Sequence, residues 1–232
     1  MSQTRAIRTR SRIAQTAAVE FARCGYAGTS LTRICTGAEV TIGALTFHFS
    51  SKMDLADAVC ARGKDTTRAA IAQAVAGAEL SLQAIVDVTH VIALLLRDNE
   101  CVSAASRLCR EDPAAQHDWY NIWLPTVRGL AAQAQKMGEL RSGTTPDGLS
   151  VLAACLVSGV ESTALQAAAG EQDERPVHEL LSGMWEGVLR GIAAPELDGR
   201  VRPESRGAES GQDPRRAAAN APPRPAGSGG RG

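Results

Sequence analysis

The segment 31–49 constrains the fold more than any other part of this 232-residue chain. Its pattern predicts a short helix over 31–38, a tight turn at Glu39–Val40 and a second short helix over 42–48, for which Thr41 is a suitable N-cap. A set of apolar residues would fill one small core with the preceding helix: Ala17, Phe21, Leu31, Ile34, Ala38, Val40, Leu45 and Phe49. Such a rigid core leaves the outer face of the second helix exposed, which is the geometry of a helix-turn-helix.

Groups on and beside this outer face are suited to contact double-stranded DNA. Gly43 and Ala44 are small enough to allow a close approach, and hydroxyl, imidazole and cationic groups nearby can bind phosphate. We expect the DNA-binding residues to be Thr29, Ser30, Arg33, Thr41, Ile42, Gly43, Ala44, Thr46, Phe47, His48 and Lys52. Arginines of the preceding segment could reach adjacent phosphates or a minor groove: Arg5, Arg8, Arg10 and Arg12. The alternative is an ordinary helical hairpin within a bundle.

The charges are distributed unevenly, although the formal net charge is zero. Residues 1–52 carry seven Lys or Arg and two Glu, whereas residues 53–194 carry eleven basic and eighteen acidic residues. A basic end beside an acidic body indicates that this end faces a polyanion, or else that the charges merely solvate a surface. The coincidence of the basic block with the helix-turn-helix pattern favours DNA.

The rest of the chain is rich in Ala, Leu and Val, which favours helices over strands. Helix-start signals, including a capping box at Ser51–Asp54, and apolar periodicity predict further helices over about 9–23, 52–78, 81–97, 101–110, 113–137, 146–170 and 176–191. The composition from Pro195 onward is rich in Gly, Pro, Arg, Ala and Ser, which predicts disorder. We therefore expect a DNA-binding domain at 1–58, a helical ligand-binding and dimerisation domain at 59–194, and a disordered tail at 195–232.

The stretch FARCGYAGTSLTRICTGAEVTIGALTFHFSSKMDLADAV resembles the DNA-binding domain of the TetR family of bacterial repressors. Its pattern GALxFHFxSKxxLAxAV is most similar to the γ-butyrolactone autoregulator receptors of actinomycetes and their pseudo-receptor relatives. The resemblance implies an all-α fold, with three DNA-binding helices followed by six helices for ligand binding and dimerisation. It also implies a homodimeric repressor that a small molecule releases from operator DNA, controlling secondary metabolism.

Three positions depart from the pattern of this family. Ile42 stands where the family usually has a basic or polar residue, Thr46 where it has Tyr, and Glu39 where it has Gly. The first two changes remove potential DNA contacts, and the carboxylate of Glu39 would repel DNA if it faced the duplex. Two alternatives therefore remain open: a pseudo-receptor that does not respond to butyrolactone, and a protein-binding adaptor with a degenerate reading head.

Large aromatic residues mark the expected ligand site. Trp119 and Trp123 lie four residues apart, on one face of the helix predicted over 113–137. The resemblance implies that a tryptophan of this helix lines the pocket, and aromatic and aliphatic walls suit a lactone with an alkyl chain. The expected lining is Trp119, Trp123, Leu95, Val102, Leu108, Val127 and Val157. The alternative is that both tryptophans belong to ordinary core or dimer packing.

The last two predicted helices carry broad apolar faces that a monomer would expose. We expect them to pair with those of a second copy in a four-helix bundle. The residues expected at this dimer interface are Leu152, Leu156, Val160, Met184 and Val188.

The sequence shows no arrangement typical of an enzyme or a metal site. The six cysteines form no CxxC pair or Cys/His cluster with zinc spacing, so we expect free thiols and no metal or cofactor. No nucleophile with a base and no paired carboxylates occur at interpretable spacing. No apolar run reaches membrane-spanning length, and the start does not resemble a signal peptide, so we expect a cytoplasmic protein with no membrane partner.

Overall fold

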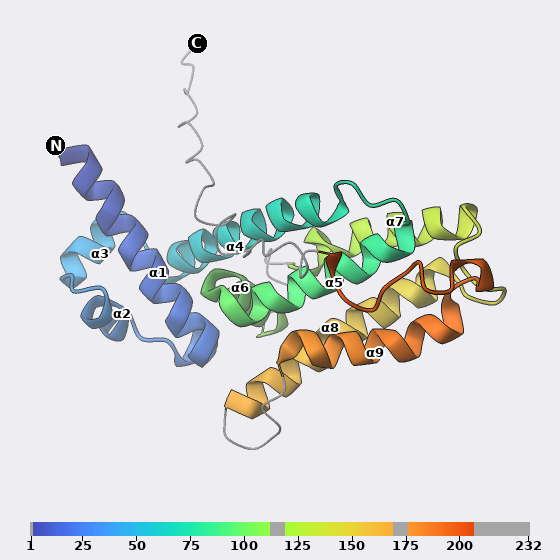
Figure 1. Cartoon of the computed structure of the whole chain (residues 1–232). Coiled ribbons are helices and arrows are strands. Elements are labelled where there is room, and N and C mark those ends of the chain that lie inside the picture. The colour runs from blue at the N-terminus through green and yellow to red at the C-terminus, as the bar shows by residue number, and fades with distance from the viewer. Residues whose placement is uncertain (1, 112–118, 169–175, 207–232) are drawn as a thin grey trace, which may run out of the picture.

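The computed structural model describes residues 2–111, 119–168 and 176–206, and these residues fold into helices (Figure 1). The α-helices are α1 (Ser2–Gly28), α2 (Leu31–Gly37), α3 (Ile42–His48), α4 (Lys52–Val75), α5 (Ser81–Asp98), α6 (Glu100–Glu111), α7 (Leu124–Lys136), α8 (Pro146–Ala168) and α9 (Val177–Ile192). Two 3₁₀ turns, Tyr120–Ile122 and Pro195–Leu197, and one isolated bridge between Leu140 and Ala193 accompany them.

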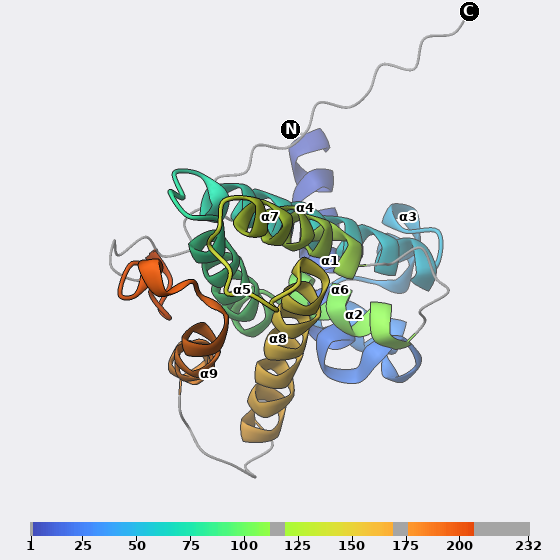
Figure 2. The same cartoon turned by 90° about the vertical axis from the view of Figure 1, so that its right-hand side faces the viewer.

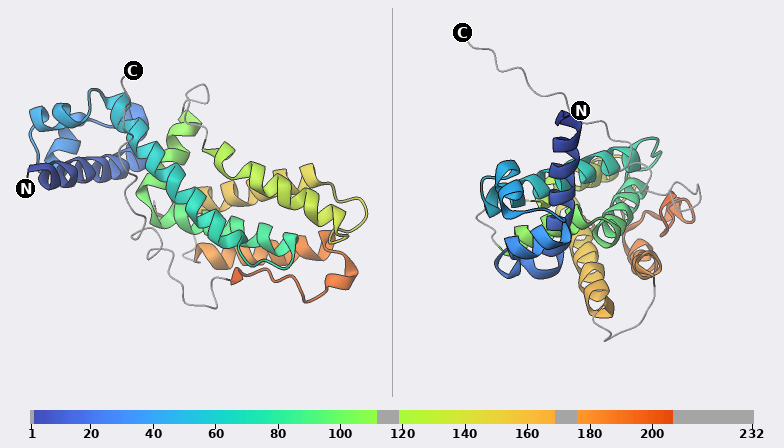
Figure 3. Two further views of the ribbon diagram at one scale, coloured as in Figure 1. Left: turned by 90° about the horizontal axis from the view of Figure 1, so that it is seen from above. Right: turned by 90° about the vertical axis from the view of Figure 1, so that its left-hand side faces the viewer.

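The first three helices form a small group at one end of the molecule (Figures 1 and 3). The predicted core of this group is confirmed at six positions that are at most 1% exposed: Ala17, Phe21, Ile34, Ala38, Leu45 and Phe49. Leu31 and Val40 are only half-buried. Helix α1 starts at Ser2, earlier than the predicted residue 9, and Gly25 breaks it with φ 69° and ψ −174°.

Helix α4 joins this group to the larger helical body. The hydroxyl of Ser51 accepts a hydrogen bond from the backbone N–H of Asp54, and the Asp54 carboxylate accepts one from the N–H of Ser50. These bonds form the capping arrangement predicted at Ser51–Asp54, except that Asp54 accepts from Ser50 instead of Ser51, and they fix where α4 begins. The buried face of α4 packs against α5 and α6, so α4 belongs to both parts of the molecule.

Helix α5 is the centre of the helical body (Figure 2). Almost its whole length is buried, and it contacts α4, α6, α7, α8 and α9. Its first turn is covered by Glu139, whose carboxylate accepts hydrogen bonds from the N–H groups of Ser81 and Leu82 at 3.1 and 2.7 Å. This buried carboxylate satisfies backbone donors that no preceding helical turn can satisfy.

The prediction of a single helix over 113–137 is wrong for the residues that the structure describes. Residues 120–122 form a 3₁₀ turn, and α7 begins only at Leu124. Pro125 explains this start, because a proline has no backbone N–H and its ring clashes with the preceding turn of an α-helix. Residues 112–118 lie outside the described part of the chain.

The expected disorder from residue 195 is also wrong for residues 195–206, which we call the C-terminal strap. The strap runs back along the body, and Arg206 binds Asp87 of α5, with 2.5 Å between Nε and Oδ2. The Arg206 guanidinium also donates to the carbonyls of Gly77 and Ala74, at the end of α4. The remaining residues of the predicted tail, 207–232, lie outside the described ranges.

Among the described helices, none combines the length and the apolar character needed to cross a membrane.

Candidate functional site

Helix α3 presents an uncharged outer face. Ile42 is 54% exposed and Phe47 is 82% exposed, whereas Leu45 points into the core. Gly43 and Thr46 are exposed as well, and Ala44 and His48 are half-buried, with the imidazole edge-on to the Phe47 ring at 5.2 Å. A phenylalanine this exposed gains nothing from the fold of its own chain, so the outer face of α3 is available to a partner.

Two hydroxyl groups at α3 are engaged by the helix itself. The Thr41 hydroxyl caps α3 by accepting a hydrogen bond from the N–H of Ala44 at 3.1 Å. The Thr46 hydroxyl donates to the carbonyl of Gly43, also at 3.1 Å. Both groups stabilise the helix and are thereby less available to a base edge.

The remaining expected DNA-binding residues lie in different environments. Thr29 is only 4% exposed and donates to the carbonyl of Gly25 at 2.6 Å, so its expected phosphate contact is wrong. Its hydroxyl instead satisfies a carbonyl left free where α1 breaks. Ser30 is half-buried, and exposed Arg33 pairs with Glu20 at 3.2 Å. The ammonium of Lys52 lies 4.6 Å from the centre of the Tyr26 ring, a cation–π contact that holds it beside α3.

A basic groove runs between the start of α1 and the start of α3. Its volume is about 490 Å³, and it is lined by Arg5, Arg8, Thr9, Arg12, Glu39, Val40, Thr41 and Ala44. The guanidinium of Arg10 lies nearby, 4.6 Å from the centre of the Phe49 ring. Three guanidinium groups beside an exposed helix make a surface that attracts phosphate.

Glu39 is the acidic member of this groove, and its backbone is strained. Its φ is 50°, in the left-handed region that favours glycine. The carbonyl oxygen accepts a hydrogen bond from Arg12 at 3.4 Å, and the carboxylate lies 4.0 Å from the same guanidinium. The carboxylate therefore partly neutralises the groove.

Replacing Glu39 with glycine should raise the free energy of unfolding by about 1 kcal/mol, because glycine adopts a positive φ without a Cβ clash. It should also strengthen binding to DNA, since it removes a carboxylate from the groove. Urea denaturation and DNA titration measure the two effects. Glu39→Gln is the matched control: it should strengthen DNA binding but leave stability unchanged. Equal stabilisation by both variants would show that the backbone conformation is not the cause.

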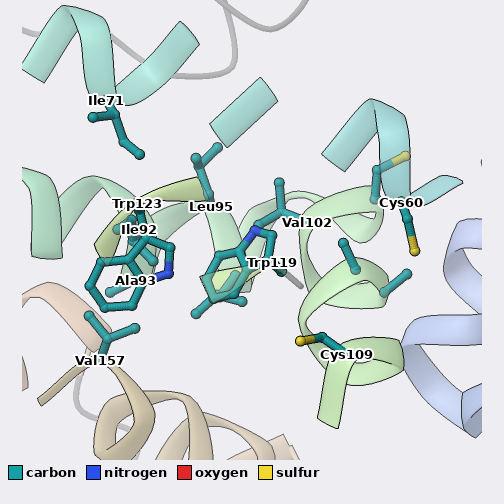
Figure 4. Packing of buried hydrophobic residues seen from close by; sticks show 14 of the residues in the cluster. Cys60, Ile71, Ile92, Ala93, Leu95, Val102, Cys109, Trp119, Trp123 and Val157 are labelled. Atoms are coloured by element: carbon teal, nitrogen blue, oxygen red, sulfur yellow. The ribbon is translucent and has the colours of Figure 1, made fainter. Parts of the chain in front are cut away.

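A second cluster lies inside the helical body, around the tryptophans (Figure 4). All seven residues expected to line a ligand pocket are at most 5% exposed. Trp119 and Trp123 flank the 3₁₀ turn instead of sharing a helical face, and their ring centres are 6.1 Å apart. The Nε1–H of Trp119 donates to the Thr67 hydroxyl at 3.2 Å, whereas the buried Nε1–H of Trp123 has no partner among the described residues. An unpaired buried donor is costly and indicates a place for an acceptor.

A polar network adjoins these aromatic rings. Arg110 of α6 donates to Glu161 of α8 at 2.6 Å and to the hydroxyl of Ser106 at 2.8 Å. The ring of Tyr120 lies 5.4 Å from that of Trp119 and 6.1 Å from that of Trp123. No sequence pattern predicts this network, because its members come from α6, α8 and the 3₁₀ turn and lie far apart along the chain.

A set of hydrogen bonds that we call the α1–α6 latch joins the first helices to the helical body. Arg107 of α6 donates to the carbonyls of Ala22 and Arg23 at 3.1 and 2.7 Å, and it also donates to Glu111 at 2.9 Å. The Glu111 carboxylate accepts from the N–H of Tyr26 at 2.7 Å. The latch therefore caps the broken end of α1 with side chains of the other domain.

The outer faces of α8 and α9 are partly open. Leu152, Leu156, Met184 and Val188 are half-buried, but Val160 is 1% exposed inside the protomer, so its expected place at a dimer interface is wrong. Its side chain belongs to the buried core of the protomer. On α9, a Cβ at Gly183 or Gly187 would meet nothing within 4 Å.

Thiol chemistry is not favoured in the described residues. The six cysteines are free, and Cys35, Cys60, Cys101 and Cys109 are buried. Burial raises the pKa of Cys60 to about 12, so its thiol stays protonated at neutral pH. Within the described ranges, no group of three or more His, Cys, Asp or Glu residues could hold a metal ion.

Comparisons with known proteins agree with this geometry. Residues 13–59 match the family of bacterial regulatory proteins named tetR. The A-factor receptor protein of Streptomyces griseus is 29% identical over 206 residues, which cover 88% of this chain and 71% of that protein. A γ-butyrolactone receptor crystal structure aligns with a TM-score of 0.69 and 24% identity, covering 94% of this chain and 100% of the other. CprB from Streptomyces coelicolor, in complex with its biological operator sequence, aligns with a TM-score of 0.69 and 25% identity, covering 89% and 98%.

Proposed function

We propose that this chain is a DNA-binding repressor of the TetR family, related to the γ-butyrolactone receptors, and that a small apolar ligand of the butyrolactone type releases it from its operator. The all-α fold predicted from the sequence is confirmed, and residues 13–59 match the predicted family. Members of the family bind DNA and are not enzymes, and this chain is accordingly not an enzyme. The genes it controls are proposed to serve secondary metabolism.

The exposed α3 beside a basic groove carries the DNA half of this proposal. α3 would enter the major groove, while Arg5, Arg8 and Arg12 of the groove would bind the adjacent backbone. Lys52, held beside α3 by Tyr26, would bind a further phosphate. Thr29 is omitted from this set because its hydroxyl is buried.

The unpaired Nε1–H of Trp123 supports the ligand half. A carbonyl or ring oxygen of a lactone could accept this hydrogen bond, and Leu95, Val127 and Val157 would enclose an alkyl chain. Because these side chains are almost inaccessible, the ligand can enter only if the helices that enclose them move apart. Ligand binding would thus favour a different arrangement of the body.

The α1–α6 latch supplies a route from this site to DNA. α6 contributes Val102 and Leu108 to the tryptophan cluster and Arg107 and Glu111 to the latch. A shift of α6 would therefore move the end of α1. In a homodimer, the two α3 helices must lie about 34–36 Å apart to enter successive major grooves, so a small rotation of each domain would lower operator affinity.

Selection of binding sites from random DNA, repeated with candidate γ-butyrolactones, tests the proposal. We expect the protein to select a two-fold symmetric sequence and a lactone to release it. Trp123→Phe should weaken lactone binding about fivefold, because one hydrogen bond is lost, and leave operator affinity unchanged. Trp119→Phe is the control, since the Nε1–H of Trp119 is already paired with Thr67. Equal lactone affinity with and without operator DNA would exclude the coupling.

One observation favours a second candidate, a repressor that does not respond to butyrolactone. A cavity of about 490 Å³ lies in the DNA-binding domain and another of about 260 Å³ lies between α1 and the helices α5 and α6, and neither is lined by Trp119 or Trp123. If the tryptophan cluster is closed, its side chains belong to the hydrophobic core and bind no ligand. Selection of an operator that no lactone releases, with no lactone bound in calorimetry, would favour this candidate.

A further inference from the structure

We propose that α3 reads its operator through the C5-methyl groups of thymine, with Ile42 and Phe47 as the reading side chains. The inference rests on the proposed function, since it needs α3 in a major groove. It concerns how the base sequence is distinguished, which depends on the side chains that the outer face of α3 offers.

Helix α3 offers few polar groups to a base edge, and its hydroxyl groups are partly engaged by the helix itself. Residues 42–48 include no Arg, Lys, Asn or Gln, the side chains that form paired hydrogen bonds with guanine or adenine. The hydroxyl of Thr41 accepts from the N–H of Ala44, and that of Thr46 donates to the carbonyl of Gly43. His48 is half-buried and lies edge-on to the Phe47 ring.

What remains on this face is apolar and exposed. Ile42 is 54% exposed in the first turn of α3, and Phe47 is 82% exposed near its end. The small residues Gly43 and Ala44 between them permit a close approach. The only apolar group that a base pair shows in the major groove is the thymine methyl.

The charges around this face of α3 favour double-stranded DNA over a protein as its binding partner. The groove at the start of α3 is lined by Arg5, Arg8 and Arg12, and Lys52 follows its end. An apolar strip bordered on both sides by cations matches the major groove, in which base methyl groups lie between two phosphate backbones. Ile42 stands where the family usually has a basic or polar residue. On this proposal, the change replaces a polar contact with recognition of a thymine methyl group, and base recognition at this position is retained.

Substitution of deoxyuridine for thymidine tests the inference, because it removes the methyl group and nothing else. The probe is the duplex that the full-length protein selects from random DNA, with each thymine replaced in turn. Loss of one methyl contact should weaken binding about fourfold per half-site. Thymines contacted by Ile42 should lose this sensitivity in Ile42→Ser and keep it in Phe47→Ala, and those contacted by Phe47 should show the reverse.

The outcomes separate the inference from the proposed function. Both residues are exposed, so thermal unfolding should be unchanged in both variants. A protein that selects an operator but binds its uracil derivatives equally well overturns methyl reading and leaves the repressor function intact. The same holds if Ile42→Ser keeps every uracil sensitivity of the unaltered chain. A protein that selects no sequence overturns both.

Discussion

Replacing Gly187 with arginine should convert the protein to a monomer and lower its operator affinity about 100-fold or more. In the protomer, a side chain at Gly187 meets open space, so the arginine should leave the fold intact. In the proposed dimer, the same space would be filled by α8 and α9 of the second copy, and a long charged side chain would prevent their close contact. Each monomer would then bind one half-site without the avidity of the pair.

Light scattering and operator titration measure this effect. Gln133→Asp, a charged substitution at an exposed position of α7, is the control and should leave both the mass and the affinity unchanged. Gly183→Arg offers a second test on the same face of α9, because it lies one turn before Gly187 and a Cβ there also meets nothing within 4 Å. A Gly187→Arg protein that remains dimeric would place the interface elsewhere, and the proposed pairing through α8 and α9 would have to be abandoned.

Ending the chain at Gly199 should lower the free energy of unfolding by about 3 kcal/mol, because it leaves a buried carboxylate without its cation. Asp87 has a side chain only 3% exposed, and Arg206 both pairs with it and binds the carbonyls of Gly77 and Ala74. The value lies at the low end of the range for broken buried pairs, because the side chain of Arg206 is itself 36% exposed.

A chain that ends at Arg206 is the matched control, since it keeps every described contact of the strap and should unfold at the same urea concentration as the full chain. Arg206→Ala should reproduce most of the loss in the full-length protein. Adding Asp87→Asn to Arg206→Ala should recover part of it, because a neutral amide needs no cation. If the chain ending at Gly199 is as stable as its control, the strap does not stabilise the fold.

The parts of the fold that depend on short-range patterns could be predicted from the sequence. The helix-turn-helix follows from residues fewer than twenty positions apart, whose caps and apolar spacing are visible without a structure, and the Ser51–Asp54 capping box is equally local. The main exception, Thr29, has a hydroxyl suited to bind phosphate, but the break at Gly25 provides a nearer carbonyl that it binds instead.

The parts that depend on distant partners could not be predicted. Arg206 and Asp87 are 119 residues apart, and the composition around Arg206 resembles that of disordered chains. The spacing of four residues between the tryptophans predicted that both lie on one face of an α-helix. Pro125 delays the start of α7, so the two residues flank a 3₁₀ turn instead. Their burial also depends on α4, α5 and α8, which no pattern near residues 119–123 reveals.

The α1–α6 latch has a consequence for protein engineering and for the evolution of such regulators. A Cβ at Gly25 would lie 1.8 Å from a carboxylate oxygen of Glu111, and the φ of Gly25 is 69°, so a side chain at position 25 would strain the backbone and displace Glu111. The DNA-binding domain of this chain therefore cannot be joined unchanged to the helical body of a relative. A chimera that joins this head to the body of a relative would have to carry Arg107 and Glu111 with it, or rebuild the end of α1 to match its new neighbour.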